Sequence, residues 1–335
     1  MNIYFRADGH HKMGLGHVIR SLALAQMLKG HYRLIFLIRN PIAALCAQIE
    51  KVCDELIVLP QPESNTAEAE KIRSRYLSPR DTMVLDGYHF DTAYQRIIKR
   101  SGCQLLAIDD IHAHPFVADI VLNHALGVDP EAYKLATGTR LLLGTQYTLL
   151  RPEILNTARR TDVISEESPL LICMGGADPN NDTLALLEKL YQQKMRRPIV
   201  LLTGAAYTYK EELKEWLSFH PLSVELYSDV SASQLVELMK RCPIAILPPS
   251  TIAYEYLHIG GLLFLTVIAA NQEKMFECFI ANKLAFDFKA FDETQLDFSL
   301  EKWKALLARQ ATYFDGQQQA RFKILFEELT ATLMA

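Results

Sequence analysis

Two kinds of apolar pattern alternate along the first 110 residues of the chain. Short apolar runs typical of buried strands occupy residues 3–5, 32–38, 55–59, 82–85 and 104–108. Segments with apolar residues at helical spacing lie between them, at residues 19–28, 42–51, 67–76 and 92–100. This alternation predicts a parallel β-sheet that helices cover on both faces.

A second series begins after a polar stretch. Residues 151–168 are mostly charged and polar, which is typical of a linker, and residues 120–122 and 141–143 are apolar pieces in a less regular part before it. The second series has strand-like runs at 170–174, 199–202, 223–227 and 244–247, helical segments at 182–193, 210–217 and 233–240, and a terminal helix at 317–333. We therefore predict two Rossmann-like, doubly wound α/β domains, residues 1–155 and 165–335, that face each other across a cleft. The terminal helix is counted with the second domain and can also pack back on the first.

The first strand and first helix are joined by a glycine loop, Met-Gly-Leu-Gly-His-Val-Ile-Arg at residues 13–20. Gly14 and Gly16 permit a tight turn close to a ligand, and the helix start suits an anion such as phosphate. His17 follows directly, and an imidazole with an ordinary pKa of about 6.5 suits proton transfer near neutrality. Arg20 lies one turn further on and can pair with a phosphate or a carboxylate. The alternative is an ordinary turn with a solvated histidine.

Polar side chains also follow two other predicted strands. Asp86 and Tyr88 come after residues 82–85, and Asp110 comes after residues 104–108. Carboxylates at these strand ends can orient His17 or bind sugar hydroxyls. The alternative for both aspartates is helix capping, and Tyr88 either binds substrate or only packs.

The second series has comparable loops. Gly175 and Gly176 follow a strand and predict a second anion loop. Ser250 and Thr251 start a helix, where either can act as the cap while backbone N–H groups face a phosphate. Glu255, one turn further in, can accept both hydroxyls of a ribose, or it is a solvated helix residue.

Two amides follow the apolar run at residues 262–267. Asn271 and Gln272 can bind a sugar amide or hydroxyl, and a helix cap at Asn271 explains this stretch equally well. No group of His, Cys, Asp and Glu has the spacing of metal ligands, so the sequence predicts neither a metal nor another cofactor.

Composition narrows the function classes. The chain has 335 residues and a net charge of −4, which gives no electrostatic footprint for nucleic acid or an anionic membrane. Its six dispersed cysteines predict a reduced, cytoplasmic protein, and neither a signal peptide nor a transmembrane segment is expected. Nothing in the sequence predicts a protein partner.

The ordered set of motifs resembles the nucleotide-sugar hydrolases of pseudaminic acid biosynthesis, in the same broad family as the spore-coat polysaccharide proteins and related in fold to MurG-type glycosyltransferases. The matching stretches are Arg6-Ala-Asp8-Gly9, residues 14–20, 85–88, 108–110, 144–151 and 175–179, Ser250-Thr251 with Glu255, and Asn271-Gln272. The resemblance implies a GT-B architecture with the nucleotide mainly on the C-terminal half. It also implies that His17 is the catalytic residue, that the substrate is a UDP-linked acetamido, deoxy sugar, and that no metal is needed.

One departure bears on the nucleotide. The family usually has two glycines where this chain has Pro248 and Pro249, and proline lacks the N–H that a glycine offers a phosphate. The alternatives to a hydrolase are a GT-B glycosyltransferase with a UDP-sugar donor, a hydrolysing nucleotide-sugar epimerase, and a non-catalytic nucleotide-sugar binding subunit.

Overall fold

The chain forms two compact α/β units in the computed structural model, which describes residues 1–9, 15–296 and 299–332. The first unit comprises residues 1–152 together with residues from 316 onwards, and the second comprises Glu153–Asp315. Among the described residues, no helix is long and apolar enough to cross a membrane.

In the described part of the first unit, seven parallel strands form one sheet in the order β3-β2-β1-β4-β5-β6-β7. The strands are β1 (Asn2–Ala7), β2 (Arg33–Arg39), β3 (Glu55–Leu59), β4 (Thr82–Asp86), β5 (Gln104–Ile108), β6 (Ile120–Asn123) and β7 (Arg140–Leu143). The last two are only four residues long, which explains why their sequence pattern is weak. The strand order reverses between β1 and β4, and ligands of such sheets bind at the carboxyl ends of the strands beside this reversal.

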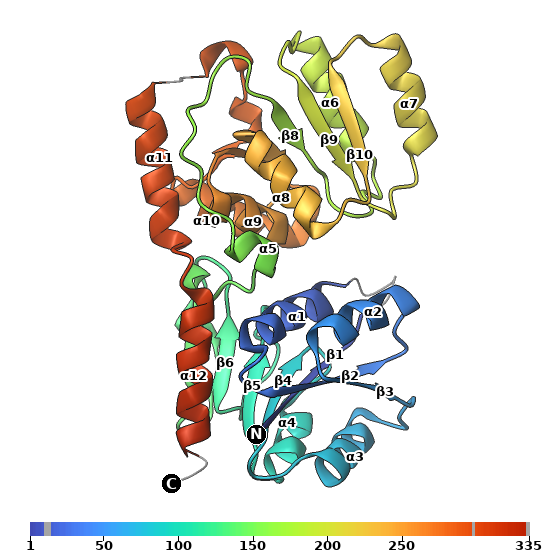
Figure 1. Ribbon diagram of the computed structural model, residues 1–335, viewed down its shortest axis with the longest axis vertical. Helices are drawn as coiled ribbons and strands as arrows, with labels where there is room; N and C mark the ends of the chain where they lie inside the picture. The colour runs from blue at the N-terminus through green and yellow to red at the C-terminus, as the bar shows by residue number, and fades with distance from the viewer. Residues whose placement is uncertain (10–14, 297–298, 333–335) are drawn as a thin grey trace. The chain divides into compact units, whose positions relative to one another are not determined.

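Helices cover both faces of this sheet. They are α1 (Gly16–Leu28), α2 (Ala43–Val52), α3 (Asn65–Tyr76), α4 (Thr92–Lys99) and α12 (Gln318–Thr332), with 3₁₀ turns at Pro130–Ala132 and Thr145–Tyr147. Because parallel crossovers are right-handed, α1 and α2 lie on one face and α3 and α4 on the other, as Figure 1 shows. The strands between them are apolar and buried, as the sequence pattern predicts; Ile3 and Phe5 of β1 are fully buried.

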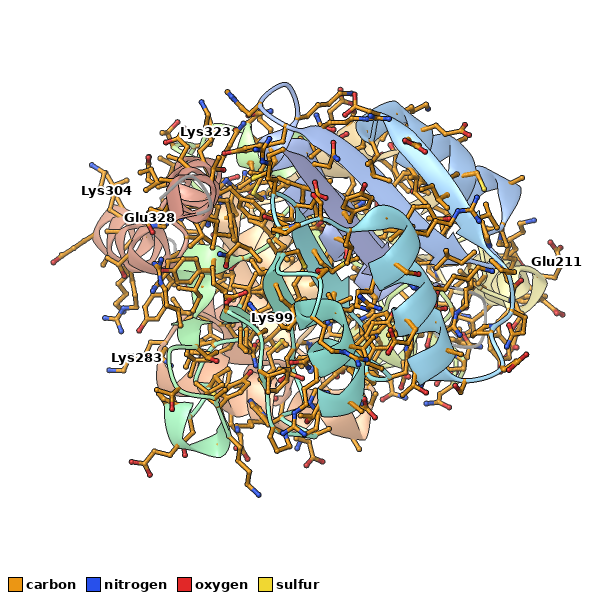
Figure 2. All side chains as sticks on the ribbon, turned by 90° about the horizontal axis from the view of Figure 1, so that it is seen from below. Lys99, Glu211, Lys283, Lys304, Lys323 and Glu328 are labelled. Carbon is orange, nitrogen blue, oxygen red and sulfur yellow. The ribbon has the colours of Figure 1, made fainter. Side chains whose placement is uncertain are left out.

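The terminal helix α12 packs on α1. Phe322 and Phe326 on its inner face are fully buried, and the ring of Phe326 contacts that of Tyr32. At its outer side, Glu328, which Figure 2 labels, accepts a hydrogen bond from Arg140 of β7 at 2.7 Å. The structure thus groups α12 with the first unit, in agreement with the expectation that it can pack back on the first domain, although we counted it within residues 165–335. Helical spacing shows that one face of a helix is buried but not which partner buries it.

A network of buried charges, here named the closed cluster, ties β1 and β2 to two helices of the first unit. Its members are Arg6, Asp8, Arg39, Glu68 and Tyr94. Arg6 is fully buried and donates to Asp8 at 2.5 Å and to Glu68 at 3.0 Å. Each charge in this network therefore has a partner of opposite sign, as burial requires.

The second unit repeats the architecture, with six parallel strands among its described residues in the order β10-β9-β8-β11-β12-β13. The strands are β8 (Leu170–Ile172), β9 (Ile199–Thr203), β10 (Val224–Ser228), β11 (Ile244–Leu247), β12 (Leu262–Leu265) and β13 (Phe286–Asp287). The helices are α5 (Pro152–Leu155), α6 (Asp182–Gln192), α7 (Lys210–Phe219), α8 (Ala232–Arg241), α9 (Thr251–Ile259), α10 (Glu273–Ala281) and α11 (Leu300–Tyr313), with 3₁₀ turns at Ala270–Gln272, Phe288–Ala290 and Glu293–Gln295. Here the strand order reverses between β8 and β11.

Two arginines fix the predicted linker to the second unit. Arg160 donates to the carbonyls of Lys240 and Gly260 at 2.6 and 2.8 Å, at the ends of α8 and α9. Arg159 donates to the carbonyls of His258 and Phe314 at 2.6 and 3.0 Å. Helix carboxyl ends carry partial negative charge, so guanidinium groups are stabilised there. Arg159 and Arg160 therefore anchor this stretch to the second unit, whereas Asp162, Glu166 and Glu167 are exposed.

Candidate active site

The first unit brings together five of the predicted site residues at the carboxyl ends of β1, β4 and β5. We name this group, His17, Arg20, Asp86, Tyr88 and Asp110, the open cluster. His17 lies in the first turn of α1, and Asp86 is the last residue of β4, the strand beside β1. Nδ1 of His17 lies 2.7 Å from Oδ1 of Asp86, and both side chains are buried.

The protonation of Asp86 decides which imidazole nitrogen is basic. Burial alone would raise the pKa of this carboxyl, but the charge of Arg20 and hydrogen bonds from His17 and Arg20 outweigh it and hold the pKa below its ordinary value. An ionised carboxylate only accepts hydrogen bonds, so Nδ1 of His17 donates to it. In the neutral imidazole, Nε2 then carries the lone pair and is the basic atom.

Arg20 is bound to protein carboxylates on two sides. Its Nε and Nη2 donate to the two oxygens of Asp86 at 2.7 Å each, and Nη1 donates to Asp110 at 2.7 Å. Burial would lower the pKa of Arg20, but the two carboxylates raise it above its ordinary value. The predicted pairing with a carboxylate is thus realised within the protein itself.

Tyr88 forms the exposed edge of the open cluster. Its ring stands at 85° to the ring of His17, with centroids 4.7 Å apart, and 52% of the residue is exposed. Burial of the hydroxyl end and the charge of Asp110 raise the pKa of Tyr88 to about 12, so the phenol stays a hydrogen-bond donor. The capping alternative fails for Asp86, because the N-cap of α4 is Asp91.

Two further residues belong to this region and were not predicted. The hydroxyl of Ser21 lies 3.3 Å from Oδ2 of Asp86, and its spacing of four residues from His17 on one helix was the available signal. His124 follows β6, the neighbour of β5, and burial together with the charge of Arg20 lowers its pKa to about 4. No sequence signal pointed to His124, because β6 itself was not recognised.

The glycine loop is described only in part. Gly14 lies outside the described residues. Gly16 is the first residue of α1, and a Cβ built on it would meet no atom within 4 Å. Steric need therefore does not explain Gly16 in this structure.

In the second unit, the loop at Gly175 and Gly176, which we predicted to bind an anion, differs from a simple phosphate-binding loop. Gly175 has a positive φ of 93°, and Gly176 packs so closely on Gly204 that a Cβ on Gly204 would lie 2.2 Å from the carbonyl oxygen of Gly176. Asp178 accepts hydrogen bonds from the N–H groups of residues 182 and 183 at 2.8 and 2.9 Å. A carboxylate of the protein therefore already occupies the start of α6.

The start of α9 differs from that of α6. Ser250 is its N-cap residue, Thr251 is its first residue, and among the described residues the Ser250 hydroxyl makes no capping hydrogen bond. Glu255, one turn further on, is only 1% exposed, which excludes a solvated helix position. Sequence position alone could not distinguish these two outcomes for Glu255.

Asn271 and Gln272 lie in a 3₁₀ turn after β12. The side-chain oxygen of Gln272 accepts a hydrogen bond from the N–H of Ile268 at 3.0 Å and so holds the loop. Asn271 is exposed and is not the N-cap of either adjoining helix, since those positions are Ala269 and Gln272. Within the described ranges we find no group of three His, Cys, Asp or Glu side chains placed to hold a metal ion.

Comparison with known proteins yields three relatives. The chain is 25% identical over 290 residues to the uncharacterized protein MJ1062 of Methanocaldococcus jannaschii, covering 83% of this chain but only 57% of that protein's length. It is 23% identical over 278 residues to the UDP-2,4-diacetamido-2,4,6-trideoxy-beta-L-altropyranose hydrolase of Campylobacter jejuni, covering 82% of this chain and 94% of the hydrolase. It is 22% identical over 268 residues to the spore coat polysaccharide biosynthesis protein SpsG of Bacillus subtilis, covering 78% and 75%.

Solved structures support the fold. The calicheamicin glycosyltransferase CalG4 superposes with a TM-score of 0.62 at 14% identity, over 98% of both chains. MurG of Acinetobacter baumannii superposes with a TM-score of 0.56 at 13% identity, over 96% of this chain and 94% of MurG. No family model matches the sequence. The chain is therefore a distant homologue of the Campylobacter jejuni hydrolase and of SpsG, and it has the GT-B fold of the glycosyltransferases.

Proposed function

We propose that this protein hydrolyses a UDP-linked acetamido, deoxy sugar to the free sugar and UDP, in the biosynthesis of a surface polysaccharide or a pseudaminic-type acid. The observation that carries the proposal is the pairing of His17 with Asp86, which leaves Nε2 as the basic nitrogen. The reaction and the substrate class are those that the distantly homologous hydrolase is named for, and the role in polysaccharide biosynthesis is the one that SpsG is named for.

In the proposed reaction, His17 is the general base. Nε2 takes a proton from water as the water oxygen bonds to the anomeric carbon of the sugar. The bond from that carbon to the phosphate oxygen breaks, and its electron pair leaves with UDP. Asp86 stabilises the imidazolium that forms, and direct displacement inverts the anomeric carbon.

The open cluster contributes to sugar binding in this proposal. Tyr88 offers a phenol donor and Asp110 a partly exposed carboxylate at the edge of the cluster. Both suit hydroxyl and amide groups on a sugar.

Nucleotide binding is assigned to the second unit from its own residues. Ser250 and Thr251 begin α9, whose N–H groups suit a diphosphate, and Glu255 is the buried carboxylate for the ribose. Asn271 and Gln272 are proposed sugar ligands. Calorimetry of UDP binding to wild type and Glu255→Ala tests this assignment; equal affinities would remove Glu255 from the site.

The reaction is tested by incubating the protein with UDP-sugars in ¹⁸O-water and no acceptor. We expect free UDP and free sugar by NMR, with ¹⁸O at the anomeric carbon of the sugar. Label in UDP would place the attack at phosphorus and contradict the mechanism. Turnover only with an added sugar acceptor would identify a glycosyltransferase, and binding without turnover would identify a binding subunit.

A further inference from the structure

A second group of polar residues, which we name the tyrosine network, lies at the carboxyl ends of β5 and β6. Its members are Asp109, His112, Asn123 and Tyr133. Oδ2 of Asp109 accepts hydrogen bonds from the backbone N–H of His112 at 2.9 Å and from the hydroxyl of Tyr133 at 3.1 Å. The same hydroxyl accepts from the side-chain amide of Asn123 at 3.0 Å. None of these four residues takes part in the reaction proposed above.

Three side chains of the tyrosine network are almost excluded from solvent. Asn123 is 2% exposed, and Asp109 and Tyr133 are each 8% exposed. Burial is the main cause that raises the pKa of Tyr133, so its hydroxyl keeps its proton and donates to Asp109 near neutral pH. A buried polar group that loses its partner is costly, so these bonds hold the network in one arrangement.

The tyrosine network fixes the bend at residues 109–112 that follows β5. The backbone N–H of Asp109 donates to the carbonyl of Leu122 in β6 at 2.9 Å, which joins the start of the bend to the sheet. At its end, His112 has a φ of 54°, a left-handed conformation that residues other than glycine rarely adopt. Its ring stands at 76° to the ring of Tyr133, with centroids 4.4 Å apart. Such backbone strain persists where the surrounding contacts determine it, and here they include the bond from His112 to Asp109.

Asp110 lies inside this bend and belongs to the open cluster. Its carboxylate accepts from Nη1 of Arg20 at 2.7 Å. Arg20 in turn binds both oxygens of Asp86, the partner of His17. The backbone on both sides of Asp110 is held by bonds of Asp109, so the position of the Asp110 carboxylate depends on those bonds.

We propose that Asp109 is a positioning residue, which holds the bend so that Asp110 stays bound to Arg20 and presents its exposed side to the sugar. The proposal deepens the proposed function and rests on it for the sugar, whereas the contact between Asp110 and Arg20 belongs to the protein alone. It gives the two neighbouring aspartates different tasks, since Asp109 binds within the tyrosine network and Asp110 within the open cluster.

The first test follows Arg20 by NMR in protein labelled with ¹⁵N-arginine, and it needs no turnover. Rotation of the guanidinium about its Nε–Cζ bond exchanges the two Nη signals, and each bond to a carboxylate slows this rotation. The signals are assigned by their loss in Arg20→Lys, and Asp110→Ala gives the rotation rate without the Asp110 contact. In Asp109→Ala we expect the rotation to accelerate to the rate in Asp110→Ala. Rotation at the wild-type rate in Asp109→Ala overturns the proposal.

Two milder variants distinguish hydrogen bonding from charge. Both bonds to the Asp109 side chain go to Oδ2, and an asparagine has one oxygen that can accept both, so Asp109→Asn should rotate at the wild-type rate. Acceleration in Asp109→Asn equal to that in Asp109→Ala would assign the effect to charge and contradict the proposal. Tyr133→Phe removes one of the two bonds and serves if Asp109→Ala does not fold; we expect a smaller acceleration. An unchanged rate in Tyr133→Phe would count against the proposal.

Asp119, which precedes β6 at the opposite end of the sheet, offers a matched control. Its carboxylate accepts from the N–H of Leu105 in β5 at 2.7 Å and from Lys99 at 2.6 Å, so it too joins these two strands. Asp119→Ala should lower stability and leave the rotation of Arg20 at the wild-type rate. Equal acceleration in Asp119→Ala and Asp109→Ala would reduce Asp109 to a general structural role.

Kinetics separate this inference from the proposed function. If the protein hydrolyses a UDP-sugar, Asp109→Ala and Asp110→Ala should each raise KM by roughly fivefold, the effect of one lost hydrogen bond, and the double variant should raise it no further. A rise of roughly 25-fold in the double variant would show that Asp109 acts independently of Asp110, against the proposal. If the wild type hydrolyses no UDP-sugar, the proposed function fails, and the rotation of Arg20 still decides the role of Asp109.

Discussion

The first unit holds two groups of paired arginines and carboxylates, the closed cluster and the open cluster, and they differ in which polar atoms remain available to a ligand. In the closed cluster, Asp8 accepts from Arg6 at 2.5 Å and from Arg39 at 2.7 Å, and Glu68 accepts from Arg6 and from the hydroxyl of Tyr94. Burial alone would raise the pKa of Asp8, but hydrogen bonds and charge from Arg6 and Arg39 lower it to about 2. The polar groups of the closed cluster thus form hydrogen bonds with one another.

The open cluster contains a histidine and the closed cluster contacts one, and the two histidines differ in their hydrogen bonds. His89 sits against the closed cluster, with Nε2 3.1 Å from Nη2 of Arg39, and burial and the charge of Arg6 lower its pKa to about 4. That nitrogen accepts a hydrogen bond from an arginine, so its lone pair is occupied. His17 instead donates through Nδ1 to Asp86, which directs the lone pair to Nε2. A histidine beside paired arginines and carboxylates is thus a structural residue at the closed cluster, and a candidate general base in the open cluster.

The largest expected effect separates these two histidines. His17→Ala should lose about 10²–10⁴-fold in kcat for UDP-sugar hydrolysis, the usual contribution of a general base, while UDP still binds. His89→Ala is the matched control, a buried histidine of the same unit, and should retain turnover in the protein that stays folded. Steady-state kinetics and UDP calorimetry measure both. Near-wild-type turnover in His17→Ala would end the proposed mechanism.

Breaking the closed cluster should affect stability instead. Glu68→Ala leaves the fully buried Arg6 with one carboxylate fewer, and removing one partner of a buried ion pair typically costs about 3–5 kcal/mol. Urea unfolding at pH 7 measures the loss. A loss below about 1 kcal/mol, typical of surface pairs, would show that the network is not acting as a buried one.

Acid should weaken the fold through His89. Its pKa is about 4 in the folded chain against an ordinary 6.5, so the unfolded chain binds a proton first as the pH falls. This contribution to stability is complete above pH 6.5 and is lost between pH 6.5 and 4, by up to about 3 kcal/mol. His89→Gln should therefore lose less stability than wild type between pH 7 and 4.5, as followed by urea unfolding. An identical pH dependence in the two proteins would argue that His89 titrates normally.

The smallest expected effect concerns the two phenols. Tyr88→Phe removes an exposed donor at the open cluster, and we expect a rise in KM of roughly fivefold, about 1 kcal/mol, with kcat little changed. Tyr94→Phe removes the donor to Glu68 in the closed cluster and should lower stability by a similar energy without changing KM. The comparison is contradicted if the KM change occurs in Tyr94→Phe instead.

The residues of the open cluster could be predicted from the sequence because one rule of parallel sheets applies to most of them. Strand ends of a parallel sheet meet at one edge, so His17, Asp86 and Asp110 could be placed together before any coordinates existed. The sequence could not show which groups Arg20 binds, because a guanidinium pairs equally well with a carboxylate of a ligand and with one of the protein. It missed Glu68 entirely, because an acidic residue on a polar helix reads as solvent-exposed.

The terminal helix shows the same limit at the level of the fold. Phe322 and Phe326 indicate a buried face, but about 160 residues separate α12 from the rest of its unit. Pattern and periodicity act over a few turns, and pairing over such a distance depends on the complementary face of α1.

The anchoring of Arg159 has a consequence for how the chain is made. This residue lies near the point where the chain enters the second unit, and its bond to the carbonyl of Phe314 holds it beside the point where the chain leaves. The second unit is thus an insert with adjacent ends. On the ribosome it can close while the first unit still lacks α12, so α1 keeps an apolar face uncovered until residues 318–332 emerge. During synthesis, the half of the protein that begins first is completed last.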